Sequence, residues 1–389
     1  MPALLIMRCE NILLSYPLPI RLMRSLLKLT AYALIALMAI LLGIIFYFEF
    51  RFYLGIPVIR ASDFVPFYEE FLLSALPAPF MAILFRKSQT EIKEQRSRSF
   101  LRMALGIMWI LDAILQVQPE MNNLFAQYDL IPMLSMGFPV TQVILLSVNV
   151  WSSNPPLMDL AAAIIQLYIG VLYLVTKRGL AFNINEAAAI VWCSVIWVFG
   201  EGFGGVFTTG SSILTGLPGS VLFYLVGALV LFFTANEDNK MRAEKTIRYA
   251  TVLTLLISLG FQAYPANGFW SSLPVNVFPS PYGFLGFAVT AQTRIAASSG
   301  VFNAIFVAII AVAILLWLVK SMFAPILTFC FAVFTWIIYQ GLGIVAQFST
   351  DSNTGLILAI LMVAYMLNIK AMRAARSTAV SPWPGIQGS

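Results

Sequence analysis

Long apolar runs, separated by short polar or basic segments, dominate this chain. A helix needs about 17–25 mainly apolar residues to cross a bilayer, and no soluble fold contains so many runs of that length. The pattern predicts an all-α, polytopic membrane protein with ten transmembrane helices, at residues 29–50, 67–85, 102–118, 157–176, 184–206, 217–236, 248–265, 296–319, 324–346 and 355–371.

One further apolar run, 131–151, is also long enough to span. Counting it as a span would invert every loop that follows and place the later basic residues on the outer side. We therefore interpret it as a re-entrant or interfacial helix on the outer side, and the alternative of an eleventh span stays open.

The distribution of basic residues predicts the orientation. With the N-terminus in the cytoplasm, all but Arg51, Arg60 and Arg294 of the 23 Lys and Arg residues lie on the inner side. Cytoplasmic loops carry this excess in membrane proteins, so we expect a multi-pass protein of the cell membrane with both termini cytoplasmic. The same distribution explains the net charge of +6 without a nucleic-acid partner.

Composition narrows the chemistry. The chain is 60% hydrophobic and 10% charged, and it contains no His. The commonest metal and haem ligand and the usual neutral-pH base are therefore missing. Its cysteines, Cys9, Cys193 and Cys330, form no CxxC pair. No ligand set for haem, an Fe–S cluster or zinc is evident, so any cofactor is expected to be held without metal ligands from this chain.

The chain is expected to divide into six segments. The cytoplasmic segment 1–28 contains Pro17 and Pro19, so no long helix is expected before Met23, which competes with Met1 as the start of translation. Two helices and a basic loop (29–101) come next, then a first four-helix unit (102–236), a cytoplasmic linker (237–247), a second four-helix unit (248–371) and a cytoplasmic tail (372–389). Pro, Gly and Ser in the tail predict disorder.

The two units show self-similarity. The stretch IVWCSVIWVFGEGFGG in the first unit resembles FAVFTWIIYQGLG in the second, and residues 162–177 resemble 307–320. An even number of helices in each unit predicts parallel copies related by a pseudo-twofold axis along the membrane normal. The matched pairs are Trp197 with Trp336, Glu201 with Gln340, Gly202 with Gly341, Gly204 with Gly343, Gln116 with Gln262, Pro119 with Pro265 and Asp112 with Ser258.

These residues carry a family resemblance. LRMALGIMWILDAILQVQP resembles the first helix of the DoxX/DoxD-type four-helix membrane proteins, with its Arg, Gly and terminal Pro, and AAAIIQLYIGVLYLVTKRG resembles their second helix. The chain departs from the pattern at Gln166, where the family tends to have Glu. The resemblance covers 102–236 and, more faintly, 248–371. It implies a subunit of a quinone-linked membrane redox complex, with other membrane or outer-side redox subunits as partners.

Two acids in the first unit form the candidate site. Asp112 and Gln116 share one helix face, with Trp109 one turn earlier. At about 1.5 Å per residue, Asp112 and Glu201 lie at similar depths, roughly 10 and 9 Å below the outer surface. Intramembrane carboxylates are costly and normally face a bundle interior or a cavity. We predict a shared pocket for a proton, a cation or a polar headgroup such as that of a quinone. Alternatively, each acid bonds separately and only joins helices.

Glu69 and Glu70 lie near the outer end of their helix and are candidates for the same pocket. Two other functions stay open beside the redox subunit: a transporter for a small solute or proton, because the bundle is duplicated and contains membrane carboxylates, and a membrane scaffold without chemistry.

Overall fold

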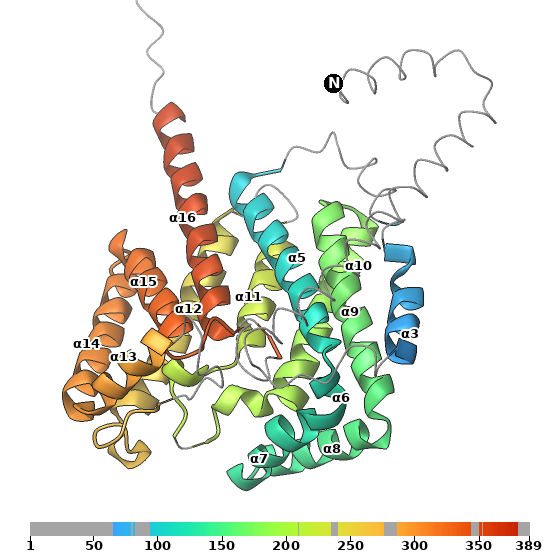
Figure 1. Cartoon of the computed structure of the whole chain (residues 1–389). Coiled ribbons are helices and arrows are strands. Elements are labelled where there is room, and N and C mark those ends of the chain that lie inside the picture. The colour runs from blue at the N-terminus through green and yellow to red at the C-terminus, as the bar shows by residue number, and fades with distance from the viewer. Residues whose placement is uncertain are drawn as a thin grey trace, which may run out of the picture.

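A computed structural model describes residues 65–78, 81, 94–208, 210–234, 240–275, 286–343, 350–351 and 353–379. These residues form helices, turns and loops, with no strand among them, as the sequence predicts. The predicted helix at 29–50, the choice of start residue and the last part of the tail, 380–389, lie outside the described residues. Figure 1 shows the helices as one bundle whose long members run roughly parallel to a common axis.

Six helices of the described part are long and apolar enough to cross a membrane, as a multi-pass membrane protein requires. They coincide with six of the ten predicted spans. The six are α5 (Arg96–Gln116), α9 (Pro155–Val175), α10 (Leu180–Val195) with its π-helical continuation η4 (Ile196–Gly200), α12 (Lys240–Ala263), α14 (Ser299–Leu318) and α16 (Thr354–Ala379).

Three other predicted spans overlap shorter helices among the described residues. The run 67–85 overlaps α3 (Val65–Ala75), 217–236 overlaps α11 (Ser220–Phe233), and 324–346 overlaps α15 (Phe323–Ile338). Glycines explain where α11 begins and where α15 ends. Gly219 before α11 and Gly341 after α15 have φ of 97° and 56°, values that end a right-handed helix although the surrounding sequence stays apolar.

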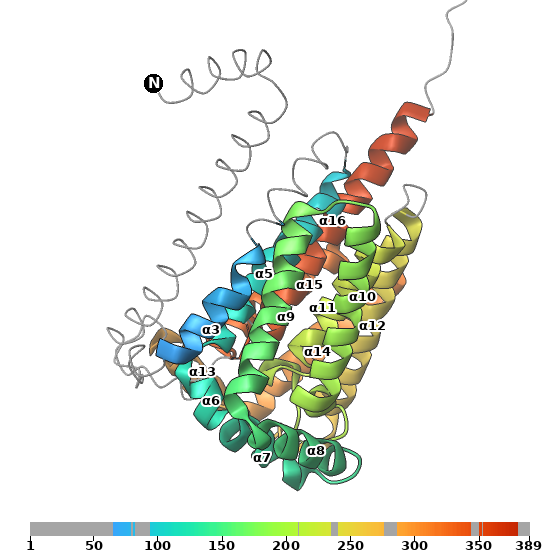
Figure 2. The same cartoon turned by 90° about the vertical axis from the view of Figure 1, so that its right-hand side faces the viewer.

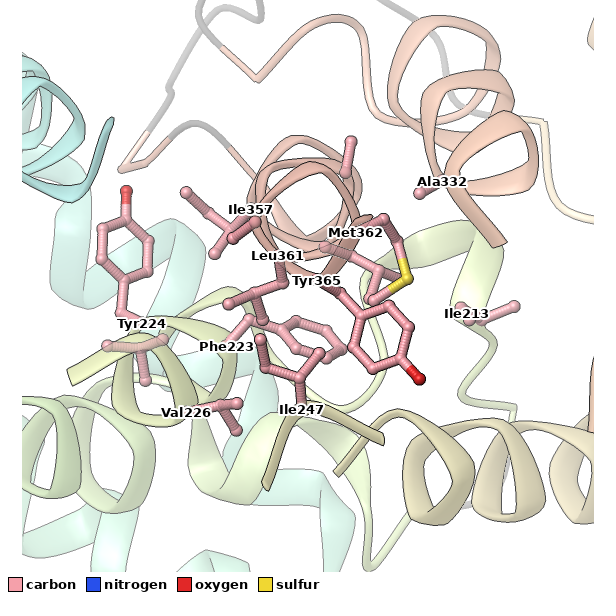
Figure 3. Close-up of a cluster of buried hydrophobic side chains, with 14 of the residues drawn as sticks. Ile213, Phe223, Tyr224, Val226, Ile247, Ala332, Ile357, Leu361, Met362 and Tyr365 are labelled. Carbon is pink, nitrogen blue, oxygen red and sulfur yellow. The ribbon is translucent and has the colours of Figure 1, made fainter. Parts of the chain in front are cut away.

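The helices pack in a regular order. Within the predicted first unit α5 runs along α9 and α10 along α11, and within the predicted second unit α12 runs along α14 and α15 along α16. The two sets meet where α11 contacts α16, α11 contacts α12, and α5 contacts α16. The centre of this junction is apolar: Figure 3 shows Phe223 of α11, Ile247 of α12 and Leu361 of α16 gathered between these helices, and all are buried.

Two glycines let α5 and α9 approach closely. A Cβ on Gly170 would lie 2.8 Å from the carbonyl oxygen of Gly106 and 2.9 Å from the backbone nitrogen of Ile110. A Cβ on Gly106 would in turn lie 3.0 Å from the carbonyl oxygen of Gly170. Small residues at a membrane helix interface permit this backbone contact, and it fixes the position of α5, which carries the first candidate acid.

The segment between α5 and α9 lies across one end of the bundle (Figures 1 and 2). It consists of α6 (Pro119–Phe125), the π-helical η2 (Ala126–Leu130), the short α7 (Ile131–Met133), the 3₁₀ turn η3 (Leu134–Met136) and α8 (Val140–Ser153). The apolar run 131–151 is therefore not one continuous helix, because the chain turns at Gly137, whose φ is 81°. At 14 residues α8 is too short to cross a bilayer and instead covers the ends of the longer helices.

Hydrogen bonds between distant segments identify which helix ends are neighbours. At one end, Arg98 at the start of α5 donates to the carbonyl oxygen of Lys177 after α9, at 2.8 Å. At the other end, Thr354 at the start of α16 donates to the carbonyl oxygen of Gly216 before α11, also at 2.8 Å. The second end contains the glycine-rich turns, and the candidate site lies beside it.

Candidate functional site

The first four-helix region encloses a cavity of about 480 Å³, here called the apolar cavity. It lies between α5, α8, α9, α10 with η4, and α11, and most of its wall is aliphatic or aromatic. The four principal residues of the predicted site, Trp109, Asp112, Gln116 and Glu201, all line it. Its wall also includes Met121, Leu130, Leu146, Ile165, Gln166, Trp192, Phe199, Ser220, Tyr224 and Asp351.

The apolar cavity is partly open at an apolar rim. Three of its lining side chains, on α8, α9 and η4, are exposed: Leu146 at 53%, Ile165 at 36% and Phe199 at 38%. The polar side chains Asp112 and Gln116 of its wall are more enclosed, at 3% and 5% exposed.

Asp112 is buried in the wall between α5 and α11. The hydroxyl of Tyr224 donates a hydrogen bond of 2.5 Å to its Oδ2, and the ring of Tyr224 lies 4.8 Å from that of Trp109, centroid to centroid. Charge-assisted O–H···O bonds are short, so this distance fits a phenol bound to a carboxylate. The contact joins the two helices and leaves Asp112 on the cavity wall.

Gln116 bonds to an acid that the sequence analysis did not single out. Its Nε2 donates to Oδ1 of Asp159 on α9 at 2.8 Å, and Nδ2 of Asn122 donates to Oδ2 of the same carboxylate at 2.8 Å. Asp159 is fully buried. Its place beside prolines at the start of a predicted span resembled an ordinary helix beginning. The signal that could have identified it is that an acid falls inside the predicted span 157–176.

Glu201 does not lie within a helix. The prediction that a span covers 184–206 is wrong at its end, because the helical conformation stops at Gly200. Gly202, Phe203 and Gly204 then take left-handed values, with φ of 53°, 63° and 59°. A Cβ on Gly204 would overlap the carbonyl of Pro218, so only glycine fits there. This turn places the Glu201 carboxyl against the start of α11.

A second acid, Asp351, lies close to Glu201, and both acids contact Ser220, the first residue of α11. Oγ of Ser220 lies 2.8 Å from Oε1 of Glu201 and 2.6 Å from Oδ2 of Asp351. The backbone nitrogen of Val221 also donates to Oε1 of Glu201, at 3.2 Å. The sequence analysis missed Asp351, because its residue type is common in polar turns and nothing in the sequence places that turn beside the first unit.

The contacts of Ser220 with Glu201 and Asp351, here called the bridge, determine how many protons the two acids hold. A hydroxyl has one hydrogen and can donate only one of these two bonds. The other bond needs a hydrogen from the carboxyl itself. When both contacts are made, one of the two acids is therefore protonated, which also avoids placing two buried like charges together.

A second, more polar cavity of about 310 Å³, here called the vestibule, lies on the far side of this bridge. Glu201, Ser220 and Asp351 line both cavities, and the vestibule adds Asp129 of η2. Burial raises the pKa of Asp129 to about 7, and the charge of Asp351 adds to this rise. Burial likewise raises the pKa of Asp351, against the lowering effect of its bond from Ser220. Neither cavity is lined by Lys or Arg among the described residues.

The two weaker candidates lie elsewhere. Glu69 and Glu70 are exposed on α3, and neither belongs to the described lining of the two cavities. A metal centre has no support in the described part of the chain, where no group of three His, Cys, Asp or Glu side chains could hold an ion.

Comparison with known proteins adds no assignment. Neither family models, nor characterised proteins, nor solved structures give a match to this chain. The DoxX/DoxD resemblance therefore stays a prediction, and function has to be argued from the geometry of the two cavities.

Proposed function

We propose that this integral membrane protein binds a lipid-soluble ligand with a polar headgroup, of the quinone class, as the membrane subunit of a redox complex. The observation that carries the proposal is the partly open apolar cavity, which has exposed apolar side chains at its rim and carboxyl groups in its wall. In this proposal the rim faces the bilayer. The chain contributes the binding site. The electron carrier that reacts with the ligand belongs to a partner subunit in this proposal.

Size and access support a ligand of this class. Small-molecule sites usually measure about 300–1,000 Å³, and they combine an apolar wall with a few polar groups that orient the ligand. The cavity's 480 Å³ lies in that range. Because its rim is formed by side chains such as Leu146 and Phe199, an apolar tail can stay in contact with lipid while the head enters.

The polar groups support a headgroup that forms hydrogen bonds. Tyr224 with Asp112 and Ser220 with Glu201 present hydroxyl and carboxyl groups on two sides of the wall. A quinone carbonyl accepts a hydrogen bond and a quinol hydroxyl donates one. Hydroxyl and protonated carboxyl groups can serve both forms, whereas a fixed cation would favour an anion.

We also propose that the chain is a tandem duplication with ten spans, its two units related by a pseudo-twofold axis. Matching contacts support this. Oε1 of Glu201 accepts from the second residue of α11, Val221, and Oε1 of Gln340 accepts from the second residue of α16, Gly355, at 2.9 Å. The left-handed turn also recurs: Gly341, Leu342 and Gly343 have φ of 56°, 60° and 68°.

A second matched contact concerns the helix pair that opens each unit. Gln116 of α5 donates to Asp159 of α9, and Gln262 of α12 donates to Oδ1 of Asn303 of α14 at 2.6 Å. In both contacts the second unit has an amide where the first has an acid. This difference supports a ligand site in the first unit and a structural role for the second.

Binding of a decyl-substituted benzoquinone to the purified protein in detergent tests the function. Quinones quench indole fluorescence on contact, and Trp109 and Trp192 lie on the cavity wall. We expect saturable quenching that Ala161→Phe at the cavity wall weakens about tenfold or more, equivalent to at least about 1.4 kcal/mol. Ala308→Phe, on an exposed face of α14, is the matched control and should bind normally. Equal binding by both variants would contradict the site.

The proposal that the chain is a subunit of a redox complex needs a separate experiment. Purification in a mild detergent should retain partner subunits together with the spectrum of a flavin, haem or iron–sulfur centre. If the protein binds the quinone but purifies alone under all gentle conditions, the binding site would be supported and the role as a redox subunit would be rejected.

A further inference from the structure

The bridge between Glu201, Ser220 and Asp351 separates the two cavities, and all three side chains border both of them. On one side the wall is mostly apolar. On the other the vestibule is lined by Asp129, Ser211, Thr215 and Asn353 together with several glycines. Phe125, Gly200 and Thr350 also border both cavities, and Glu201 and Asp351 are the acids common to the two linings.

We propose that Glu201 and Asp351 share one proton through Ser220 and pass protons between the vestibule and the apolar cavity. This inference extends the proposed function to a ligand that gains or loses protons, but the shared proton does not depend on a bound ligand. Three observations on different atoms support it.

The first is the hydrogen count at Ser220. Its Oγ makes contacts of 2.8 Å and 2.6 Å with the two carboxyls, and only one can use the hydroxyl hydrogen. Transfer is balanced through the same contacts. When protonated Glu201 gives its hydrogen to Oγ of Ser220, the Ser220 hydrogen moves to Oδ2 of Asp351, and the reverse shift restores the start.

The second is a pair of enclosed carboxylate oxygens beside the bridge. Oε2 of Glu201 and Oδ2 of Asp129 are both buried, and neither has a hydrogen-bond partner among the described residues. A Cβ on Gly219 would overlap Oε2 of Glu201, which shows how tightly that oxygen is enclosed. A buried carboxylate oxygen without a donor disfavours the ionised form, and proton uptake is the simplest way to neutralise it.

The third is the absence of a compensating cation. No Lys or Arg lines either cavity within the described residues, so the acids cannot be neutralised by ion pairing there. The other titratable groups that approach the pair are acids, a phenol and a thiol: Asp112 on α5, Asp129 on η2, Cys193 on α10 and Tyr224 on α11. A proton is the smallest cation that such a site can take.

Infrared difference spectroscopy of the ligand-free protein tests the proposal. We expect a band of a protonated carboxylic acid at pH 7 that shifts in D₂O, and one component of it should belong to the shared proton. Glu201→Gln and Asp351→Asn should each remove that component at pH 7, because the remaining acid no longer faces a second carboxyl. Other buried acids such as Asp159 contribute components that both variants leave unchanged. The double variant should look like either single variant.

Ser220→Ala tests the transfer step. It removes the bridging hydroxyl, and we expect the shared-proton component of the band to respond to a pH jump about tenfold more slowly, a barrier increase of about 1.4 kcal/mol. Thr234→Ala is the matched control. It removes a hydroxyl after the end of α11 that bonds to a backbone carbonyl and lines neither cavity, so the rate should not change.

Three results would overturn the proposal. One is a protein without a protonated carboxyl at pH 7. Another is a band that keeps all its components in both single-acid variants. The third is a band that follows the concentration of Na⁺ or K⁺ at constant pH, which would assign the site to a metal cation. Because no ligand is added in these measurements, a negative result would reject the shared proton without rejecting quinone binding, which the fluorescence experiment tests separately.

Discussion

In the proposed duplication two acids of the first unit, Asp159 and Glu201, are matched with the amides Asn303 and Gln340 of the second unit. Each amide accepts a hydrogen bond that resembles that of the acid. Amides provide the same shape without ionisation. Acids at these two positions therefore favour a role for charge or protons over the joining of helices alone.

The raised pKa of Asp129 predicts how stability depends on pH. Its folded value of about 7 lies above the ordinary value of 3.8, so between these values the folded state binds more protons than the unfolded state. Stability should therefore fall as pH rises from about 4 to about 7 and level off above that. The raised pKa of Asp351 acts in the same direction.

Melting temperatures in detergent at pH 5.5 and pH 8 provide the measurement. We expect a lower melting temperature at pH 8, and a smaller difference between the two pH values in Asp129→Asn. Glu70→Gln, at an exposed position on α3, is the control and should behave as the wild type. A melting temperature that rises with pH in this range would show that the vestibule acids are stabilised as anions.

The sequence identified part of the site for physical reasons. Asp112 and Glu201 stood out because a carboxyl in an apolar run is costly. Asp351 did not, since an acid in a polar turn needs no explanation. Its role depends on contact with Ser220, a residue 131 positions away in sequence. Long-range contacts of this kind cannot be predicted from periodicity.

At the scale of helices, the close contact between α5 and α9 depends on two glycines. Gly106 and Gly170 each lie against the backbone of the other helix, so a side chain at either position would force the helices apart. The sequence analysis noted both glycines only as part of a family resemblance. The structure supplies their physical role, and α5 carries Trp109, Asp112 and Gln116.

We predict that Gly170→Ala destabilises the protein by about 1–3 kcal/mol, because the new Cβ meets backbone atoms that cannot move independently. The control is Gly260→Ala on α12, where an added Cβ meets nothing within 4 Å and should if anything stabilise the helix. Thermal unfolding of both variants in detergent gives the comparison. Equal melting temperatures would show that α5 and α9 can separate without penalty.

Helix positions were predictable to the extent that hydrophobicity alone sets them. The runs 157–176 and 296–319 correspond to α9 and α14 within a few residues. The predictions for 184–206 and 324–346 extended too far. Both runs stay apolar through glycine turns, and a left-handed backbone conformation does not change the hydropathy of a sequence.

For the whole molecule, the helix ends that carry most basic residues lie together. Arg98 contacts Lys177, and Tyr365 in the middle of α16 donates to Glu244 near the start of α12. The glycine turns and both cavities lie toward the opposite end. We predict from the basic residues that the basic end lies in the cytoplasm, which would place the vestibule on the outer side of the membrane.

Cysteine labelling tests this orientation. In a background without the three native cysteines, we expect Ser271→Cys to react with an impermeant maleimide in intact cells. Met322→Cys should react only after the cells are permeabilised. Both positions are exposed in loops or at a helix boundary, so access to reagent should depend on the side of the membrane. The reverse pattern would invert the topology.

The most direct test of the account is photoaffinity labelling with a benzoquinone that carries a diazirine in its alkyl tail, followed by mass spectrometry of the labelled peptides. We predict labels on the three elements that form the rim, at or beside Leu146, Ile165 and Phe199, and their loss when unlabelled quinone is added in excess. Labels spread over lipid-facing helices such as α14, or labels that excess quinone does not reduce, would contradict a ligand site in the apolar cavity.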